Sequence, residues 1–293
     1  MVASGFAGLG YQVVWTQQCA LWLGHESASV LAVVAAFFGG IALGALWLGP
    51  RIERSERPVR WYAFCEAAIA LWGLALLGLM SPVSDWLLVR MGAQPAPLWQ
   101  WALAFSGTLL LLLPATVAMG ATLPAMERVM SGMTRTGAAR SIAAYYAANT
   151  FGAVLGVLGT SFWLVPQLGL ARTAAVCMTF NLLCALASWV VFPAHSPVTA
   201  DPTVAPGAAG GQGRAMLWRL AFTGLLGIGY EVLVVRVLSQ VAEDTVYTFA
   251  MLLAVYLVGT ALGAAAYERW RHRVSEAQGL GDRLLALLAM ACL

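Results

Sequence analysis

The chain alternates between long apolar runs and short segments that are polar or rich in arginine. Most apolar runs have about twenty residues or more, the length that an α-helix needs to cross the hydrocarbon core of a bilayer. They predict transmembrane helices at residues 5–23, 27–49, 61–80, 98–127, 138–165, 170–192, 216–239 and 245–268. A ninth run begins near Arg283 and stops at Leu293, after only about 15 Å of helical rise. We therefore expect the sequence to end inside a helix and to be a fragment of a longer protein.

Two stretches of the chain repeat each other without a gap. Gly-x-Gly-Tyr occurs at residues 8–11 and 227–230, and Gly-x-Ala-Leu-Gly occurs at 40–44 and 259–263, both at an offset of 219 residues. Six predicted helices separate the starts of the two copies, so both copies begin on the same side of the membrane. The repeat is therefore parallel, with its axis along the membrane normal. This pattern predicts an all-α polytopic membrane bundle of about nine transmembrane helices. It resembles a major facilitator fold with one six-helix half and the start of a second.

One long polar stretch divides the chain. Residues 193–215 are rich in Pro, Gly, Ala, Ser and Thr, a composition that cannot bury enough apolar surface to order itself. We predict a first six-helix membrane half at 1–192 and a flexible cytoplasmic linker at 193–215. The start of the second half follows at 216–293, with three helices, the last one truncated. The loop 81–97 is long enough for a short interfacial helix.

Composition makes lipid the expected solvent of these helices. The chain is 61% hydrophobic and 10% charged, whereas soluble domains are roughly 25% charged. Its mean hydropathy is +0.79. The formal net charge of +3 is too small to suggest a nucleic-acid partner. The expected partner is therefore the lipid bilayer.

The arginines indicate the orientation of the bundle. If the N-terminus is cytoplasmic, 13 of the 16 basic residues fall on the inner side of the predicted helices. Only Arg90 and Arg172 fall outside, while Arg236 lies near the outer end of a span. Because cytoplasmic loops are enriched in basic residues, this split favours a cytoplasmic N-terminus.

Four motifs carry a resemblance to a known family. They are Ser4–Thr16 (SGFAGLGYQVVWT), Gly40–Gly44 (GIALG), Pro114–Pro124 (PATVAMGATLP) and Tyr146–Gly156 (YAANTFGAVLG). In this order and spacing they resemble the membrane part of the bacterial fused major-facilitator-like/spermidine synthase family. The resemblance implies a bacterial inner membrane protein. Members of that family continue into a soluble domain similar to an aminopropyltransferase, and no segment of this sequence matches such a domain.

Polar groups inside the predicted spans are the candidate binding residues. An intramembrane carboxylate is energetically costly and suggests a functional site. Glu66 and Glu231 are carboxylates of this kind, and Glu231 stands where the first copy of the repeat has Gln12. The further candidates for substrate or ion binding are Tyr146, Asn149 and Arg236. The alternative is that these side chains form structural hydrogen bonds between helices.

Proline and glycine mark two further features. Pro114, Gly120 and Pro124 lie in one predicted helix and predict a break that lines a substrate path, or alternatively a kink that serves packing. Glycines spaced by four residues allow two helix backbones to approach closely. We expect helix packing, or alternatively a sliding surface, at Gly40, Gly44, Gly152, Gly156, Gly259 and Gly263.

The sequence shows no catalytic constellation. It has no Ser/His/Asp set, no metal-ligand spacing and no phosphate-binding loop, so we expect no catalytic residue, metal or cofactor within this chain, and whether it belongs to an enzyme stays open. Three functions remain. The first is a transporter-like bundle that moves a small solute, such as a polyamine or another cation, past Glu66 and Glu231. The second is a membrane anchor or scaffold for a soluble aminopropyltransferase-like domain. The third is a structural subunit that associates with other membrane subunits.

Overall fold

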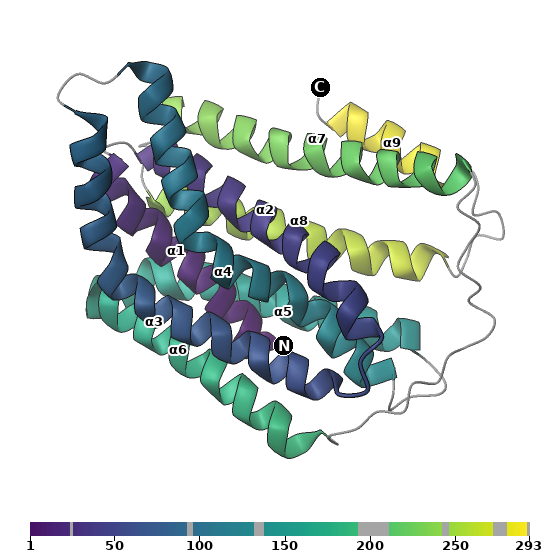
Figure 1. Cartoon of the computed structure of the whole chain (residues 1–293). Helices are drawn as coiled ribbons and strands as arrows, with labels where there is room; N and C mark the ends of the chain where they lie inside the picture. Colours follow the sequence, from purple (N-terminus) through teal and green to yellow (C-terminus); the bar gives the residue numbers. More distant parts are fainter. Residues whose placement is uncertain are drawn as a thin grey trace.

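The computed structural model describes residues 1–23, 26–92, 96–131, 138–192, 211–241, 246–271 and 280–291. Every element in these residues is helical, which confirms the predicted all-α class. The elements are α1 (Val2–Leu23), α2 (Glu26–Glu53), α3 (Pro58–Met91), α4 (Pro97–Ser131), α5 (Ala138–Gly159), the π-helical turn η1 (Thr160–Leu164), α6 (Val165–Val191), α7 (Gly211–Val241), α8 (Val246–Arg271) and α9 (Leu280–Ala291) (Figure 1).

Five helical stretches of the described chain are long and apolar enough to cross a membrane. The sequence pattern predicts about nine spans. The five stretches are Val30–Glu53, Pro58–Met91, Leu98–Met130, Tyr145–Val191 and Leu217–Leu238, and Tyr247–Gly263 is a shorter apolar helix. α1 has 22 residues, but Gln12, Gln17 and Gln18 lower its hydropathy. The chain is therefore a helical bundle of membrane type.

The stretch Tyr145–Val191 is too long for one span. Its 47 residues would rise about 70 Å as a single straight helix, more than twice the hydrocarbon thickness. Gly169 interrupts it with φ 76° and ψ 171°, a conformation that is open almost only to glycine. The chain therefore changes direction there, close to the boundary predicted between residues 165 and 170.

α3 is longer than the sequence pattern predicts. Pro58 at its first turn fits the start of a helix, because a proline there removes no helical hydrogen bond. The helix continues through Pro82 to Met91 and ends at Gly92, whose φ is 77°. Residues 81–91 of the predicted loop 81–97, which is long enough for a separate interfacial helix, thus form the last turns of α3. Similarly, α7 begins at Gly211, inside the predicted linker, and residues 193–210 of that linker lie outside the described part of the chain.

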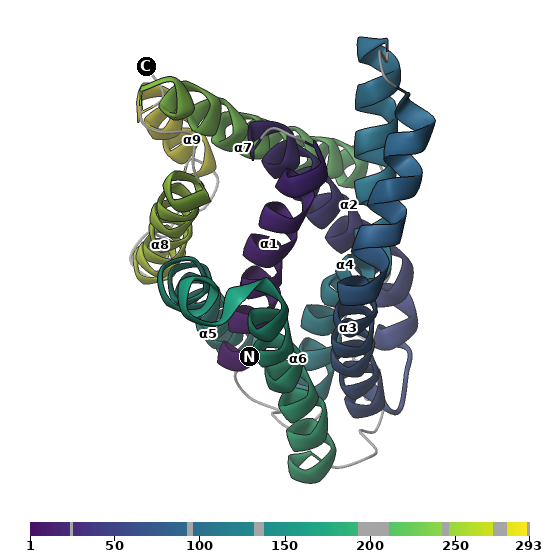
Figure 2. The same ribbon diagram turned by 90° about the vertical axis from the view of Figure 1, so that its left-hand side faces the viewer.

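The first six helices form the packed part of the molecule. α1 is central, with α5 and α6 on one side and α2, α3 and α4 on the other (Figure 2). A continuous apolar core runs between them and contains large side chains with almost no exposed surface, among them Tyr11, Trp15, Ile69 and Leu112. This core holds the helices that carry the buried polar groups in fixed positions.

α7 lies along the side of this bundle, with α8 between it and α5 (Figures 1 and 2). All side chains from residue 217 to 226 are exposed. Only 6% of the Leu217–Leu238 span is buried, against 44% of the spans formed by α2 and α3. Such a helix needs lipid or another protein surface around it.

Candidate functional site

A buried carboxylate lies where α1, α3 and α6 meet. Glu66 of α3 has no exposed surface, and Asn181 of α6 is 1% exposed. Asn181 Nδ2 donates a hydrogen bond to Glu66 Oε2 over 2.5 Å. The hydroxyl groups of Ser4 and Tyr62 also lie beside this carboxyl. Tyr62 precedes Glu66 by four residues and so shares its face of α3.

Two oxygens of this cluster accept no hydrogen bond within the described residues. They are Glu66 Oε1 and Asn181 Oδ1. Leaving a buried acceptor without a donor costs about 1–3 kcal/mol, and more for a charged group. An unpaired acceptor beside a carboxyl therefore favours a ligand that carries a positive charge or N–H donors.

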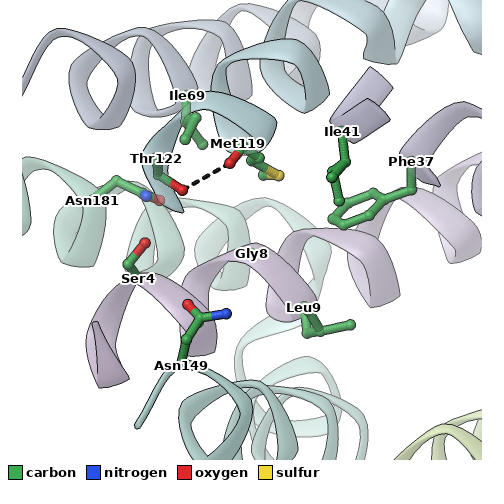
Figure 3. Close-up of a pocket in the computed structure, with 11 residues that line it drawn as sticks. Ser4, Gly8, Leu9, Phe37, Ile41, Ile69, Met119, Thr122, Asn149 and Asn181 are labelled. Atoms are coloured by element: carbon green, nitrogen blue, oxygen red, sulfur yellow. Dashed lines mark hydrogen bonds between the residues drawn. The ribbon is translucent and has the colours of Figure 1, made fainter. Parts of the chain in front are cut away.

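A cavity of about 100 Å³ adjoins the cluster (Figure 3). Asn181 lines this cavity and also binds Glu66, so it connects the cavity to the carboxyl. Each of the first six helices contributes to the lining, which consists of Ser4, Gly5, Gly8, Leu9, Phe37, Ile41, Ile69, Met119, Thr122, Asn149 and Asn181.

Glycines of α1 shape the cavity. A Cβ on Gly5 would lie 2.1 Å from the backbone oxygen of Asn149, so α1 and α5 touch through their backbones there. Gly156 makes a similar contact with the backbone oxygen of Phe6, at 2.3 Å from its Cβ position. Gly8, about one turn further along α1, has no described atom within 4 Å of its Cβ position, and it lines the cavity. The close crossing thus places Asn149 of α5 opposite Ser4 of α1 (Figure 3).

The polar lining of the cavity offers mainly oxygen acceptors. Asn181 Oδ1 is unpaired, and Asn149 contributes a half-buried side-chain amide. The Thr122 hydroxyl donates to the backbone oxygen of Met119 over 2.7 Å, which leaves only its lone pairs to the cavity. None of the lining residues that the structure describes is an arginine. This environment is suited to a small cation or an amino group and poorly suited to an anion.

The second predicted carboxylate lies elsewhere. Among the α7 side chains that the structure describes, Glu231 alone is buried, with 8% of its surface exposed. Its Oε2 accepts no hydrogen bond in the described residues. Tyr256 of α8 lies near both Glu231 and Tyr146 of α5, while Arg236 is exposed. The structure therefore brings Asn149 to the same cavity as Asn181, and places Tyr146 and Glu231 around Tyr256 at a different helix junction.

The predicted helix break and packing glycines have distinct environments. α4 is continuous from Pro97 to Ser131, so Pro114, Gly120 and Pro124 lie inside an uninterrupted helix. Gly40, Gly44 and Gly120 sit at the crossing of α2 and α4, and Gly152 and Gly156 sit at the crossing of α1 and α5. In contrast, Gly259 and Gly263 have no described atom within 4 Å of their Cβ positions.

Sequence reasoning missed three members of the cluster around Glu66. Asn181 is a polar amide inside an apolar run, so the rule that identified Glu66 would also have found it. Ser4 and Tyr62 carry no such signal, because a serine near a helix end and a tyrosine in an apolar helix are common. Only the packing of α1 against α3 and α6 brings them to the carboxyl.

The described residues contain no group of three or more His, Cys, Asp or Glu side chains that could hold a metal ion. The polar groups that line the cavity are hydroxyls and amides, and the Glu66 carboxyl lies behind them, hydrogen-bonded to Asn181. Comparison of the chain with protein-family models, with curated proteins and with solved structures finds no match.

Proposed function

We propose that this chain is a transporter-like membrane bundle that binds a small cationic solute in the cavity beside Glu66. The observation that carries the proposal is the link through Asn181, whose amide nitrogen binds the buried carboxyl while its unpaired oxygen belongs to a residue that lines the cavity. A ligand with a positive charge would satisfy that oxygen and interact with the carboxyl behind it.

The size of the cavity limits the solute. Pockets that hold drug-sized molecules have volumes of roughly 300–1,000 Å³, whereas this cavity has about 100 Å³. It has room for a few water molecules, a partly hydrated inorganic cation or one ammonium group. A polyamine would therefore enter with one amino end, while the rest of the molecule requires a more open state of the bundle.

The sequence pattern supports the transport part of the proposal. The parallel repeat, the span order of a six-helix half and the resemblance to the fused major-facilitator-like/spermidine synthase family all favour a transporter-like bundle of about nine spans. The arginine distribution favours a cytoplasmic N-terminus. The family resemblance implies a bacterial inner membrane protein.

The test is solute binding by the purified protein in lipid nanodiscs. Spermidine, ammonium and rubidium ions serve as probes, with calorimetry or a radiolabel as the readout. Glu66→Gln keeps the hydrogen bond to Asn181 and removes the charge, so we expect at least a tenfold loss of affinity with little change in the unfolding temperature. Asn181→Leu should weaken binding and also destabilise the fold by about 1–3 kcal/mol, because it removes the amide that donates a hydrogen bond to the buried carboxyl.

Glu231→Gln is the matched control, since it removes a buried carboxylate at another helix junction. It should leave binding at the cavity unchanged. If Glu66→Gln leaves the binding constant unchanged, the solute does not bind beside Glu66. If only Glu231→Gln reduces the affinity, the binding site lies at Glu231 on α7. Absence of binding for all three probes would contradict the cationic solute.

The exposed surface of α7 favours a second candidate function, that of a subunit in a larger membrane complex. All α7 side chains from residue 217 to 226 are exposed, although the helix is apolar enough to span a membrane. If this surface contacts other subunits, then the protein extracted in mild detergent should migrate as a larger complex. Leu225→Trp on α7 should disrupt that complex while binding at the cavity is retained.

A further inference from the structure

A second hollow, distinct from the central cavity, lies where the turn after α2 meets the start of α3. It has a volume of about 400 Å³ and is lined by Ser55, Arg57, Arg60, Trp61 and Phe64. None of these described lining residues carries a carboxylate. Within the described residues neither Arg57 nor Arg60 forms an ion pair, so both guanidinium groups are available to an anion.

The turn holds the two arginines in place. The Ser55 N–H donates to the backbone oxygen of Ile52 over 3.0 Å, and the Arg57 N–H donates to Ser55 Oγ over 3.1 Å. Ile52, at the end of α2, is completely buried and anchors the turn. The Arg60 guanidinium lies 5.9 Å from the ring centroid of Trp189 on α6, a cation–π contact that restricts it to this side of the bundle.

The lining changes from charged to apolar along α3. Arg60 and Phe64 are four residues apart and so share one face of α3, and Arg57 is the residue directly before the first turn of that helix. Phe64 is 67% exposed and lies about 10 Å along the helix axis from Arg57. A cationic end and an exposed aromatic ring at this separation match the phosphate and the first acyl segments of a phospholipid.

We propose that this hollow binds an anionic glycerophospholipid, with its phosphate on Arg57 and Arg60 and its acyl chain over Trp61 and Phe64. Two guanidinium groups favour a phosphate, which they bind through paired hydrogen bonds. The exposed Phe64 and the half-buried Trp61 select a lipid over a soluble phosphate, because they supply an apolar contact that inorganic phosphate cannot use. The site is independent of the proposed function and of the central cavity.

The experiment is native mass spectrometry of the purified chain in detergent, titrated with phosphatidylglycerol or phosphatidylcholine. Each arginine near an anionic headgroup contributes about fivefold in affinity. Arg57→Gln combined with Arg60→Gln should therefore weaken phosphatidylglycerol binding roughly 30-fold. The matched control is Arg51→Gln with Arg54→Gln, which removes two charges from the same region outside the hollow and should change binding fivefold at most.

Three results would overturn the proposal. The first is equal affinity for the zwitterionic lipid. The second is an equal loss in the control pair, which would show a diffuse surface charge instead of a site. The third is displacement of the lipid by millimolar inorganic phosphate, which would identify a soluble anion site.

A second pair of substitutions, which keeps both charges, tests the site if the glutamine pair misfolds. Arg57→Lys with Arg60→Lys preserves both charges and loses only the planar fork, so we expect an intermediate loss of affinity. If the glutamine pair elutes as an aggregate, the lysine pair is the test of the proposed site. Lipid affinity of the lysine pair equal to that of the unsubstituted chain would then contradict the proposed phosphate contact.

Discussion

At the scale of single residues, identical glycines of the repeat have different surroundings. Gly44 and Gly263 occupy equivalent positions in the two copies, 219 residues apart. A Cβ on Gly44 would lie 2.0 Å from the backbone oxygen of Val117, whereas a Cβ on Gly263 would meet no atom of the described residues within 4 Å. The sequence shows the glycine pattern, but the presence of a partner helix decides what each glycine does.

This difference gives a prediction with an internal control. Gly44→Ala forces α2 away from the backbone of α4 and should destabilise the bundle by about 1–3 kcal/mol. Gly263→Ala lies in open surroundings and should be neutral or slightly stabilising, because alanine favours a helix by roughly 1 kcal/mol over glycine. Thermal unfolding of both variants in the same detergent measures the difference. Equal unfolding temperatures would contradict the tight α2–α4 crossing.

The carboxylates also show how far residue-level reasoning extends. A charged side chain within an apolar run is enough to identify Glu66 and Glu231 as candidates. The sequence did not reveal that Glu66 binds Asn181, 115 residues away, or that Glu231 lies near Tyr256. Such pairs depend on which helix faces meet, and the apolar pattern of a membrane helix says little about this, because both lipid and protein neighbours are apolar.

At the scale of elements, the helices of this chain continue through three prolines but bend at one glycine. Pro82, Pro114 and Pro124 lie inside continuous helices, whereas Gly169 is where the long α5–α6 stretch bends. Neighbouring helices and local backbone adjustment can compensate for the hydrogen bond that a proline removes. Neighbouring helices cannot relieve the strain at φ 76° and ψ 171° in the same way, because a residue with a Cβ is itself strained in that conformation.

A substitution at this bend tests its importance. Gly169→Ala should destabilise the protein by about 1–3 kcal/mol, because the side chain strains a conformation that glycine alone adopts readily. Gly159→Ala is the control, since Gly159 has helical dihedral angles and only ordinary contacts with Phe6, at 3.5 Å and beyond. Denaturation followed by circular dichroism measures both. A loss in the control but not at Gly169 would show that the bend is not under strain.

At the scale of the whole molecule, the arginine distribution predicts which ends of the helices face the cytoplasm. Ser55 belongs to the turn between α2 and α3, and Arg60 at the start of α3 contacts Trp189 near the end of α6. The start of α3 and the end of α6 therefore lie at the same end of the bundle. This arrangement agrees with both segments being on one side of a membrane.

Cysteine labelling tests that orientation. Cysteines placed at Ser55 and Gly210 should resist an impermeant thiol reagent in intact cells, while one at Gln94 should react. The unsubstituted chain is the background, in which Cys19, Cys65 and Cys177 are buried. Labelling of position 55 from outside, with protection of position 94, would reverse the topology.

The sequence alone determined the all-helical class, the membrane character and most helix positions, because length and hydropathy act locally along the chain. The tertiary structure decided that Ser4, Tyr62 and Asn181 surround Glu66, that all six first helices line one cavity, and that α7 remains exposed. These features depend on backbone approach at glycine crossings and on which face each helix turns inward. Neither follows from hydropathy, since a face against lipid and a face against protein have nearly the same composition.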